Sequence, residues 1–181
     1  DMKGYSVQGY IKNYSTLSLL NGKVDTYDTN ETSAIVNTNT LTLNNVSLYC
    51  YKGVTLNTSY GNVSITNSTI YSAISNSILV QSGNVSINNS SNISIYSESG
   101  NTVKINSGSI TINNGIVYSN NGSAFTGAGT INIKAGLIYS TNAGINSTGT
   151  VNMSGGRLYS NDGNAIYSTG TINITGGEIY S

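Results

Sequence analysis

The sequence predicts an all-β fold, a single-domain parallel β-solenoid of about eight turns of about 22 residues, with three short strands per turn. Three observations predict this fold. A tyrosine-containing motif recurs at a nearly constant spacing, apolar and polar residues alternate inside each repeat, and no segment has the apolar spacing and caps of an α-helix. We expect one domain over residues 1–181, with a partial first turn at 1–15 and repeats at 16–181.

The repeat is marked by the tyrosine of an IYS-like motif, which recurs every 20 to 25 residues. The tyrosines at this position are Tyr49, Tyr71, Tyr96, Tyr118, Tyr139, Tyr159 and Tyr180. Asp25 takes the position one repeat earlier, and Tyr5 of the GYS motif is expected to take it in the first repeat. The longest step, which ends at Tyr96, contains three additional residues in NVSINNSSNISIYS (84–97).

The first two strands of each repeat show the alternation of a strand with one buried face. In the first strand, a Ser, Thr or Asn separates two apolar residues: Leu17/Leu19, Leu41/Leu43, Val63/Ile65, Val85/Ile87, Ile110/Ile112, Ile131/Ile133, Val151/Met153 and Ile172/Ile174. In the second strand, one apolar residue points inward just before the tyrosine position, at Val24, Leu48, Ile70, Ile95, Val117, Ile138, Leu158 and Ile179. The tyrosines therefore face outward.

A third strand completes each repeat. Its inward residues include Ile11, Ile35, Phe125, Ile145 and Ile166, and its position shifts by one residue in the middle repeats. Glycines fall between the first and second strands, where we expect a corner because glycine adopts a tight or left-handed backbone most easily. These corner glycines are Gly22, Gly115, Gly136, Gly156 and Gly177.

Strands this short bury their apolar sides only if the chain coils, so that each strand lies parallel to its equivalent in the next turn, about 4.8 Å away. Eight such turns give a rod about 38 Å long. Segments such as GTINITGGEIYS (170–181) resemble the repeats of the parallel β-helix of bacterial surface and secreted proteins, which includes adhesin and autotransporter stalks and the polysaccharide-lyase fold. The resemblance covers the whole chain and, with the crossover rule for parallel strands, implies right-handed coiling.

The coil turns each outward position into a column of similar residues. The tyrosine column either stabilises neighbouring turns or provides an aromatic strip that binds a polysaccharide or a neighbouring rod. A second column contains Ser18, Thr42, Ser64, Ser86, Thr111, Asn132, Asn152 and Asn173, whose side chains are expected to hydrogen-bond along the axis. Its mixed composition is too irregular for the threonine columns of ice-binding surfaces.

Charge and composition exclude several function classes. Seven basic and seven acidic residues cancel, so no electrostatic field attracts nucleic acid, and no apolar run is long enough to span a membrane. The chain has no His, and its acids are scattered from end to end, so we expect no catalytic triad or carboxylate pair and no enzyme. We expect no organic cofactor.

One acidic segment is a candidate metal site. Asp25, Asp28, Asn30 and Glu31 in DTYDTNE (25–31) supply hard oxygen ligands of the kind that Ca²⁺ prefers, although the same residues also suit a polar turn.

Two further positions have structural interpretations. Arg157 and Glu178 occupy one position in adjacent turns and are expected to pair, and Cys50 stands where other repeats have Ser, which favours a small packed thiol.

Neither end shows a sealing helix or a charged tail, so both terminal turns are expected to expose strand edges and apolar residues. Two explanations follow: subunits stack head to tail into a filament, or the chain is an excerpt of a longer adhesin. We favour an extracellular or cell-surface structural protein that polymerises end to end, with a carbohydrate-binding or adhesive module as the alternative. Its partners would be copies of itself or a polysaccharide.

Overall fold

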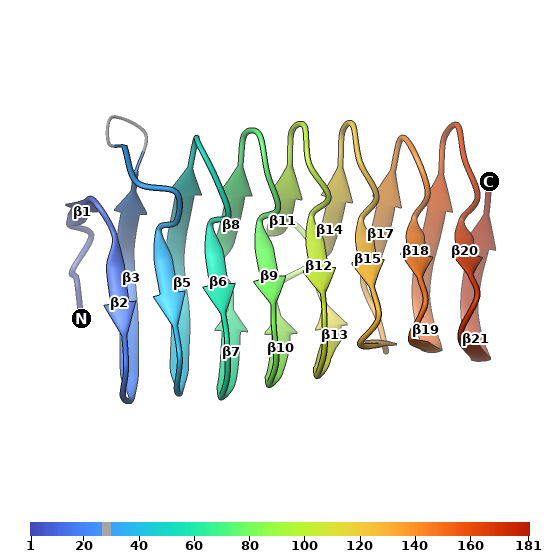
Figure 1. Ribbon diagram of the computed structural model, residues 1–181, viewed down its shortest axis with the longest axis horizontal. Coiled ribbons are helices and arrows are strands. Elements are labelled where there is room, and N and C mark those ends of the chain that lie inside the picture. Colours follow the sequence, from blue (N-terminus) through green and yellow to red (C-terminus); the bar gives the residue numbers. More distant parts are fainter. Residues whose placement is uncertain (27–29) are drawn as a thin grey trace.

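In the computed structural model, which describes residues 1–26 and 30–181, the chain coils into a rod in which each turn lies beside the next (Figure 1). The N- and C-termini lie at opposite ends of the rod. In this part of the chain, the strands pair in parallel and no helix interrupts them. The predicted all-β parallel solenoid of about eight turns is therefore confirmed.

The third strand of each turn belongs to a sheet of eight strands, which forms the near side of the rod in Figure 1. Its members are β2 (Ile11–Asn13), β4 (Ile35–Asn37), β6 (Leu56–Thr58), β9 (Ile78–Val80), β12 (Val103–Ile105), β15 (Phe125–Gly127), β18 (Ile145–Ser147) and β20 (Ile166–Ser168).

The first and second strands of each turn belong to a sheet of thirteen strands among the described residues. In four turns they run on as one long strand, namely β3 (Leu17–Asp25), β5 (Leu41–Cys50), β19 (Thr150–Ser160) and β21 (Thr171–Tyr180). In the other turns they are two strands, namely β7 (Asn62–Thr66) with β8 (Thr69–Ser72), β10 (Asn84–Asn88) with β11 (Ser94–Ser97), β13 (Ser109–Asn114) with β14 (Ile116–Ser119), and β16 (Thr130–Ile133) with β17 (Leu137–Ser140). The short β1 (Ser6–Gln8) pairs with the end of β3.

The register follows the repeat from Asp25 to Tyr180, because each residue of the tyrosine position pairs with its equivalent in the next turn. The first repeat differs from the prediction. Gln8, and not Tyr5, is the partner of Asp25. The GYS match is three residues out of register, because the strand is aligned by Val7, which lies beside the inward Val24.

The corner between the first and second strands is made by two residue types. Gly115, Gly136, Gly156 and Gly177 have positive φ values, as expected of corner glycines. At Gly22 the left-handed residue is instead its neighbour Asn21, and Gly22 permits the close approach of Met2. Asn45 and Asn67 continue this arrangement in the next two turns, and asparagine is a residue that tolerates the left-handed backbone.

Additional residues are absorbed mainly in loops, and the apolar columns stay aligned, although the register of β10 with β13 shifts by one residue after Ile87. The middle turns have one more residue between their third and first strands, and Gly61, Gly83 and Gly108 take positive φ values there. The three additional residues after Ile87 form the loop between β10 and β11. In this loop, the buried Asn89 accepts a hydrogen bond from the Ser68 backbone and donates one to it.

The core is a set of apolar columns between the two sheets. The inward residues of the inner turns are almost completely buried, and Phe125, Ile35 and Leu41 are among the largest of them. Burial of one such side chain is worth about 1.5–3 kcal/mol. Because each turn can bury its apolar residues only against its neighbours, the same columns determine what the two ends of the rod expose.

Candidate functional surfaces and rod ends

The tyrosine column runs along the outer side of the second strands. Its central rings are parallel, with centroid separations of 4.9 Å for Tyr96 and Tyr118, 4.8 Å for Tyr118 and Tyr139, and 5.3 Å for Tyr139 and Tyr159. At this separation, parallel rings overlap face to face, since two rings in one plane would bring their edge atoms within the carbon contact distance of about 3.5 Å. The central ring faces are thus turned toward each other and partly covered.

The stacking changes the acidity of the central hydroxyl groups. Partial burial, together with the neighbouring Tyr139 and Tyr96, raises the pKa of Tyr118 from its ordinary value near 10 to about 12. Burial also raises the pKa of Tyr96 and of Tyr139. These three central tyrosines therefore favour their neutral form.

Other outward residues flank the tyrosines. Ile116 and Leu137 pair with each other two positions before the central tyrosines and are only partly exposed, so the column is bordered by apolar surface. The alternation that places the tyrosines outward also places Ile116 and Leu137 outward, and this alternation is the sequence signal for the apolar border.

Charged groups lie at both ends of the tyrosine column. At the N-terminal end, Lys23 Nζ lies 2.6 Å from an Asp25 carboxylate oxygen and 4.7 Å from the ring centroid of Tyr49. At the C-terminal end, the predicted pairing of Arg157 with Glu178 is confirmed at 2.9 Å. The Tyr180 hydroxyl joins this pair, accepting a hydrogen bond from Arg157 and donating one to Glu178.

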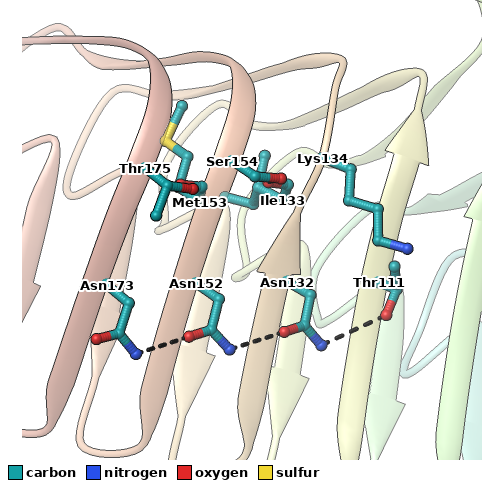
Figure 2. Close-up of a pocket in the computed structure, with 9 residues that line it drawn as sticks. All are labelled: Thr111, Asn132, Ile133, Lys134, Asn152, Met153, Ser154, Asn173 and Thr175. Carbon is teal, nitrogen blue, oxygen red and sulfur yellow. Dashed lines mark hydrogen bonds between the residues drawn. The ribbon is translucent and has the colours of Figure 1, made fainter.

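The polar column of the first strands becomes an asparagine ladder toward the C-terminal end (Figure 2). Asn173 Nδ2 donates to Asn152 Oδ1 at 2.9 Å, Asn152 Nδ2 donates to Asn132 Oδ1 at 2.8 Å, and Asn132 Nδ2 donates to Thr111 Oγ1 at 3.4 Å. All three amides therefore donate toward the N-terminal end. The carbonyl oxygen of Asn173 points away from this ladder, toward the C-terminal end of the rod.

The same face is hollowed in two places. A hollow of about 380 Å³ lies along the asparagine ladder beside Lys134, whose ammonium group extends toward Thr111 (Figure 2). A second hollow of about 300 Å³ lies over Thr42, Ser64 and Ser86 in the N-terminal half of the same column. Both hollows are open and elongated along the column, and their exposed linings combine the polar side chains with a larger share of apolar surface.

The proposed calcium site includes Asp28, which is not among the described residues, and two of its other candidate ligands have neighbouring partners in the structure. Asp25 pairs with Lys23, and the amide oxygen of Asn30 accepts a hydrogen bond from Lys52. Glu31 is partly exposed, and Asp28 lies outside the described residues. Over the ranges 1–26 and 30–181, no three His, Cys, Asp or Glu side chains lie close enough together to hold a metal ion.

Cys50 is buried and stands in register with Ser72, as its place in the repeat predicts. The serine hydroxyl at this position donates to Gly53 O at 2.8 Å and accepts from the Ser75 backbone at 3.1 Å. Serines of this column thus close the turn that follows the second strand.

The C-terminal end of the rod exposes the apolar side of its last strand. Ile172 and Ile174 of β21 are 43% and 49% exposed, whereas their partners one turn earlier, Val151 and Met153, are 0% and 1% exposed. Ile179 and Tyr180 are exposed as well. β21 pairs with β19 on one side, and its other edge forms the end of the rod (Figure 1).

The N-terminal end is partly covered by residues 1–9, which we call the N-terminal strap. Met2 donates its backbone N–H to Leu20 O at 2.8 Å, and its side chain lies so close to Gly22 that a Cβ there would overlap it. β1 then pairs with the second half of β3. Val7 and Tyr5 of the strap stay exposed.

The sequence did contain a signal for the strap. SVQ at 6–8 has the same polar–apolar–polar order as its partner KVD at 23–25, whereas the GYS motif matches only by letter.

The comparisons with known proteins found no match, whether with protein-family models, with curated proteins or with solved structures. What the structure establishes is the class, a parallel β-solenoid repeat protein. A search of the described residues for a helix long and apolar enough to cross a bilayer found none.

Proposed function

We propose that this chain is a non-enzymatic structural protein of the cell surface or extracellular space, whose rods stack end to end into a fibre. The observation that carries the proposal is the apolar edge of β21, where Ile172, Ile174 and Ile179 are exposed in positions that every inner turn buries. A parallel strand of another copy would cover this edge in the way that β21 covers β19. A contact of this head-to-tail type does not close on itself, so it generates a fibre.

The sides of the rod are compatible with such packing. The chain has a formal net charge of zero, which removes the repulsion between copies, and several of its acids have polar or basic neighbours. Glu98, for example, accepts a hydrogen bond from Asn120, and Asp1 accepts one from Asn21. The likeness to adhesin stalks supports the extracellular location by analogy of fold.

The test is assembly of the purified chain over a range of concentrations, followed by sedimentation and electron microscopy. We expect long thin fibres that Ile174→Lys abolishes, because a lysine there places a charge in the junction. Ile74→Lys is the matched control, since Ile74 is 55% exposed in the loop between β8 and β9 on the side of the rod. Discrete short particles at every concentration would contradict the proposal.

A second candidate is an adhesive or carbohydrate-binding module, and the observation that favours it is the pair of hollows along the polar column. In the asparagine ladder, each amide group donates one N–H to its neighbour and keeps a second for a sugar hydroxyl. The tyrosine column would contact a sugar through ring edges and hydroxyl groups, because its central ring faces are turned toward each other.

Affinity measurements with a panel of polysaccharides separate these two surfaces. Binding through the hollows would be lost in Asn132→Ala/Asn152→Ala, and binding through the column would be lost in Tyr139→Ala/Tyr159→Ala. Binding that survives both double variants would remove both surfaces from consideration.

A further inference from the structure

The first and last turns of the rod have the same dimensions. Ile11 of the third strand precedes Asp25 at the tyrosine position by fourteen residues, and Ile166 precedes Tyr180 by the same number. The intermediate spacings agree as well, since six residues separate Ile11 from Leu17 and Ile166 from Ile172. Several middle turns have one or more additional residues in this segment. The turns that contain Ile35, Phe125 and Ile145 keep the same spacing of fourteen residues, so the two terminal turns match each other as closely as each matches its own neighbour in the rod.

From this match, we propose that a second copy of this chain docks on the C-terminal end in one defined register, and that its N-terminal strap must leave β3 for the junction to form. The inference rests on the proposed end-to-end assembly and specifies its interface. β2 of the incoming copy pairs with β20, and β3 of the incoming copy pairs with β21. Leu17, Leu19 and Val24 of the incoming copy then cover Ile172, Ile174 and Ile179.

Charge and hydrogen bonding agree with this register. Glu178 would lie opposite Lys23 of the incoming copy, in the same column in which it already lies opposite Arg157. The carbonyl oxygen of Asn173, which points out of the rod end, would accept from the Ser18 hydroxyl and continue the ladder. The register itself follows from the segment lengths, and both contacts agree with it.

The N-terminal strap occupies the edge of β3 that this junction requires. β1 lies against the second half of β3, with Gln8 beside Asp25. In the proposed register, Tyr180 of the preceding copy lies beside the same Asp25. Two strands cannot occupy one edge, so β1 and the end of β21 compete for β3. If β1 stayed in place, β21 could pair only with β1. β2 and the first half of β3 of the incoming copy would then lie one strand spacing, about 4.8 Å, too far from β20 and the first half of β21 to pair with them.

The strap is a weak competitor. β1 has three residues, all of them exposed. The strap also includes Lys3, which holds a left-handed backbone that is unfavourable for lysine. The preceding copy offers the same three-residue edge together with the first half of β21 and all of β20. Exchange therefore replaces one short strand pairing, together with the Met2 contacts at Leu20 and Gly22, by three strand pairings.

A reversible lock tests the displacement in the full-length chain. Gln8→Cys/Asp25→Cys in a Cys50→Ser background places two thiols on register partners, whose spacing suits a disulfide. Ser is the residue that the next turn has at the Cys50 position. We expect the oxidised protein to elongate at least tenfold more slowly than the same protein after reduction. Equal elongation of the two forms would overturn the displacement, although the fibres themselves would stand.

A cross-link tests the register independently. We expect a mixed disulfide dimer when a Ser18→Cys variant is mixed with an Asn173→Cys variant. The control mixes Ser18→Cys with Asn152→Cys and should give no such dimer, because Asn152 lies one turn inside the rod. Fibres that lack the first cross-link would overturn the register and leave the proposed function intact. The absence of fibres from the wild-type chain and from the reduced lock variant would overturn both.

Discussion

The two ends of the rod differ although both are made from the same repeat. At the N-terminal end, Met2 packs against the core and β1 pairs with β3, so part of the first turn is covered. At the C-terminal end, Ile172 and Ile174 stand in the positions of buried residues and are about half exposed. A repeat sequence fixes how turns contact each other, but it does not fix what happens where a turn has only one neighbour.

The difference gives the rod a direction. The C-terminal end exposes an apolar edge, while the N-terminal end holds a short segment on the matching edge. The asparagine ladder has the same direction, since its amides all donate toward the N-terminal end. Assembly built on these ends is head to tail, and the following predictions compare the ends with the inner turns.

The largest effect is expected from one core column. Ile133→Ala should lower the free energy of unfolding by about 2–5 kcal/mol because Ile133 is fully buried. Ile174→Ala, two turns further along the same column, should cost about 1 kcal/mol or less in the dilute monomer. Denaturant unfolding of both variants measures the difference. Equal costs would mean that the C-terminal end is covered in solution.

A glycine pair compares the strap with the inner turns. Gly108 and Gly4 both have positive φ values, but a Cβ at Gly108 would overlap the carbonyl oxygen of Gly83, whereas nothing lies near a Cβ at Gly4. Gly4→Ala should cost about 1–2 kcal/mol from backbone strain alone if the strap stays attached. Gly108→Ala should cost more, and thermal unfolding of the two variants provides the ranking. A reversed ranking would show that the strap is held more firmly than the inner turns.

The asparagine ladder allows a smaller comparison. Asn152→Ala removes two ladder hydrogen bonds and Asn173→Ala removes one, so the expected losses are about 1–2 and about 0.5–1 kcal/mol respectively. Denaturant unfolding of the dilute protein is the measurement, with Asn146→Ala as an exposed control on β18. If all three variants were equally stable, the ladder would contribute nothing to stability.

The smallest effect concerns the stacked tyrosines at alkaline pH. Because the pKa of Tyr118 is raised to about 12 in the folded chain, the unfolded chain loses this proton first as the pH rises. The contribution of neutral Tyr118 to the stability of the folded chain is fully present below about pH 10, and it is lost as the pH rises through about 12. Melting temperatures across this interval should fall less steeply for Tyr118→Phe than for the wild type. Melting temperatures that fall equally steeply with pH in both proteins would contradict the raised pKa of Tyr118.

The sequence predicted the inner turns because one residue type fills each column. Once the tyrosine position was aligned, Leu48, Ile70 and Ile95 had to point inward and their register followed. The Arg157–Glu178 pair followed from the same alignment. These features depend only on the period of the repeat.

Other features depend on interactions that the period does not determine. The period places Tyr118 beside Tyr139 but does not say whether the rings lie flat or stack, and stacking turns their faces toward each other. At the corner beside Gly22, the residue with the positive φ is Asn21, and the period cannot distinguish the two because both residue types tolerate a left-handed backbone. The match of SVQ (6–8) to KVD (23–25) indicates β1, but the repeat does not predict the packing of Met2, which lies before the matched segment.

Hydrogen exchange of the backbone amides tests the central claim directly. This claim is that the exposed edge of β21 becomes covered, and the N-terminal strap is released, when rods assemble end to end. In dilute protein, we expect β19 to be protected and β21 and the strap to exchange faster. In concentrated protein, β21 should become as protected as β19, while residues 1–9 should lose the protection that they have. Protection of β21 equal to that of β19 in the dilute monomer, or no change on concentration, would contradict the account.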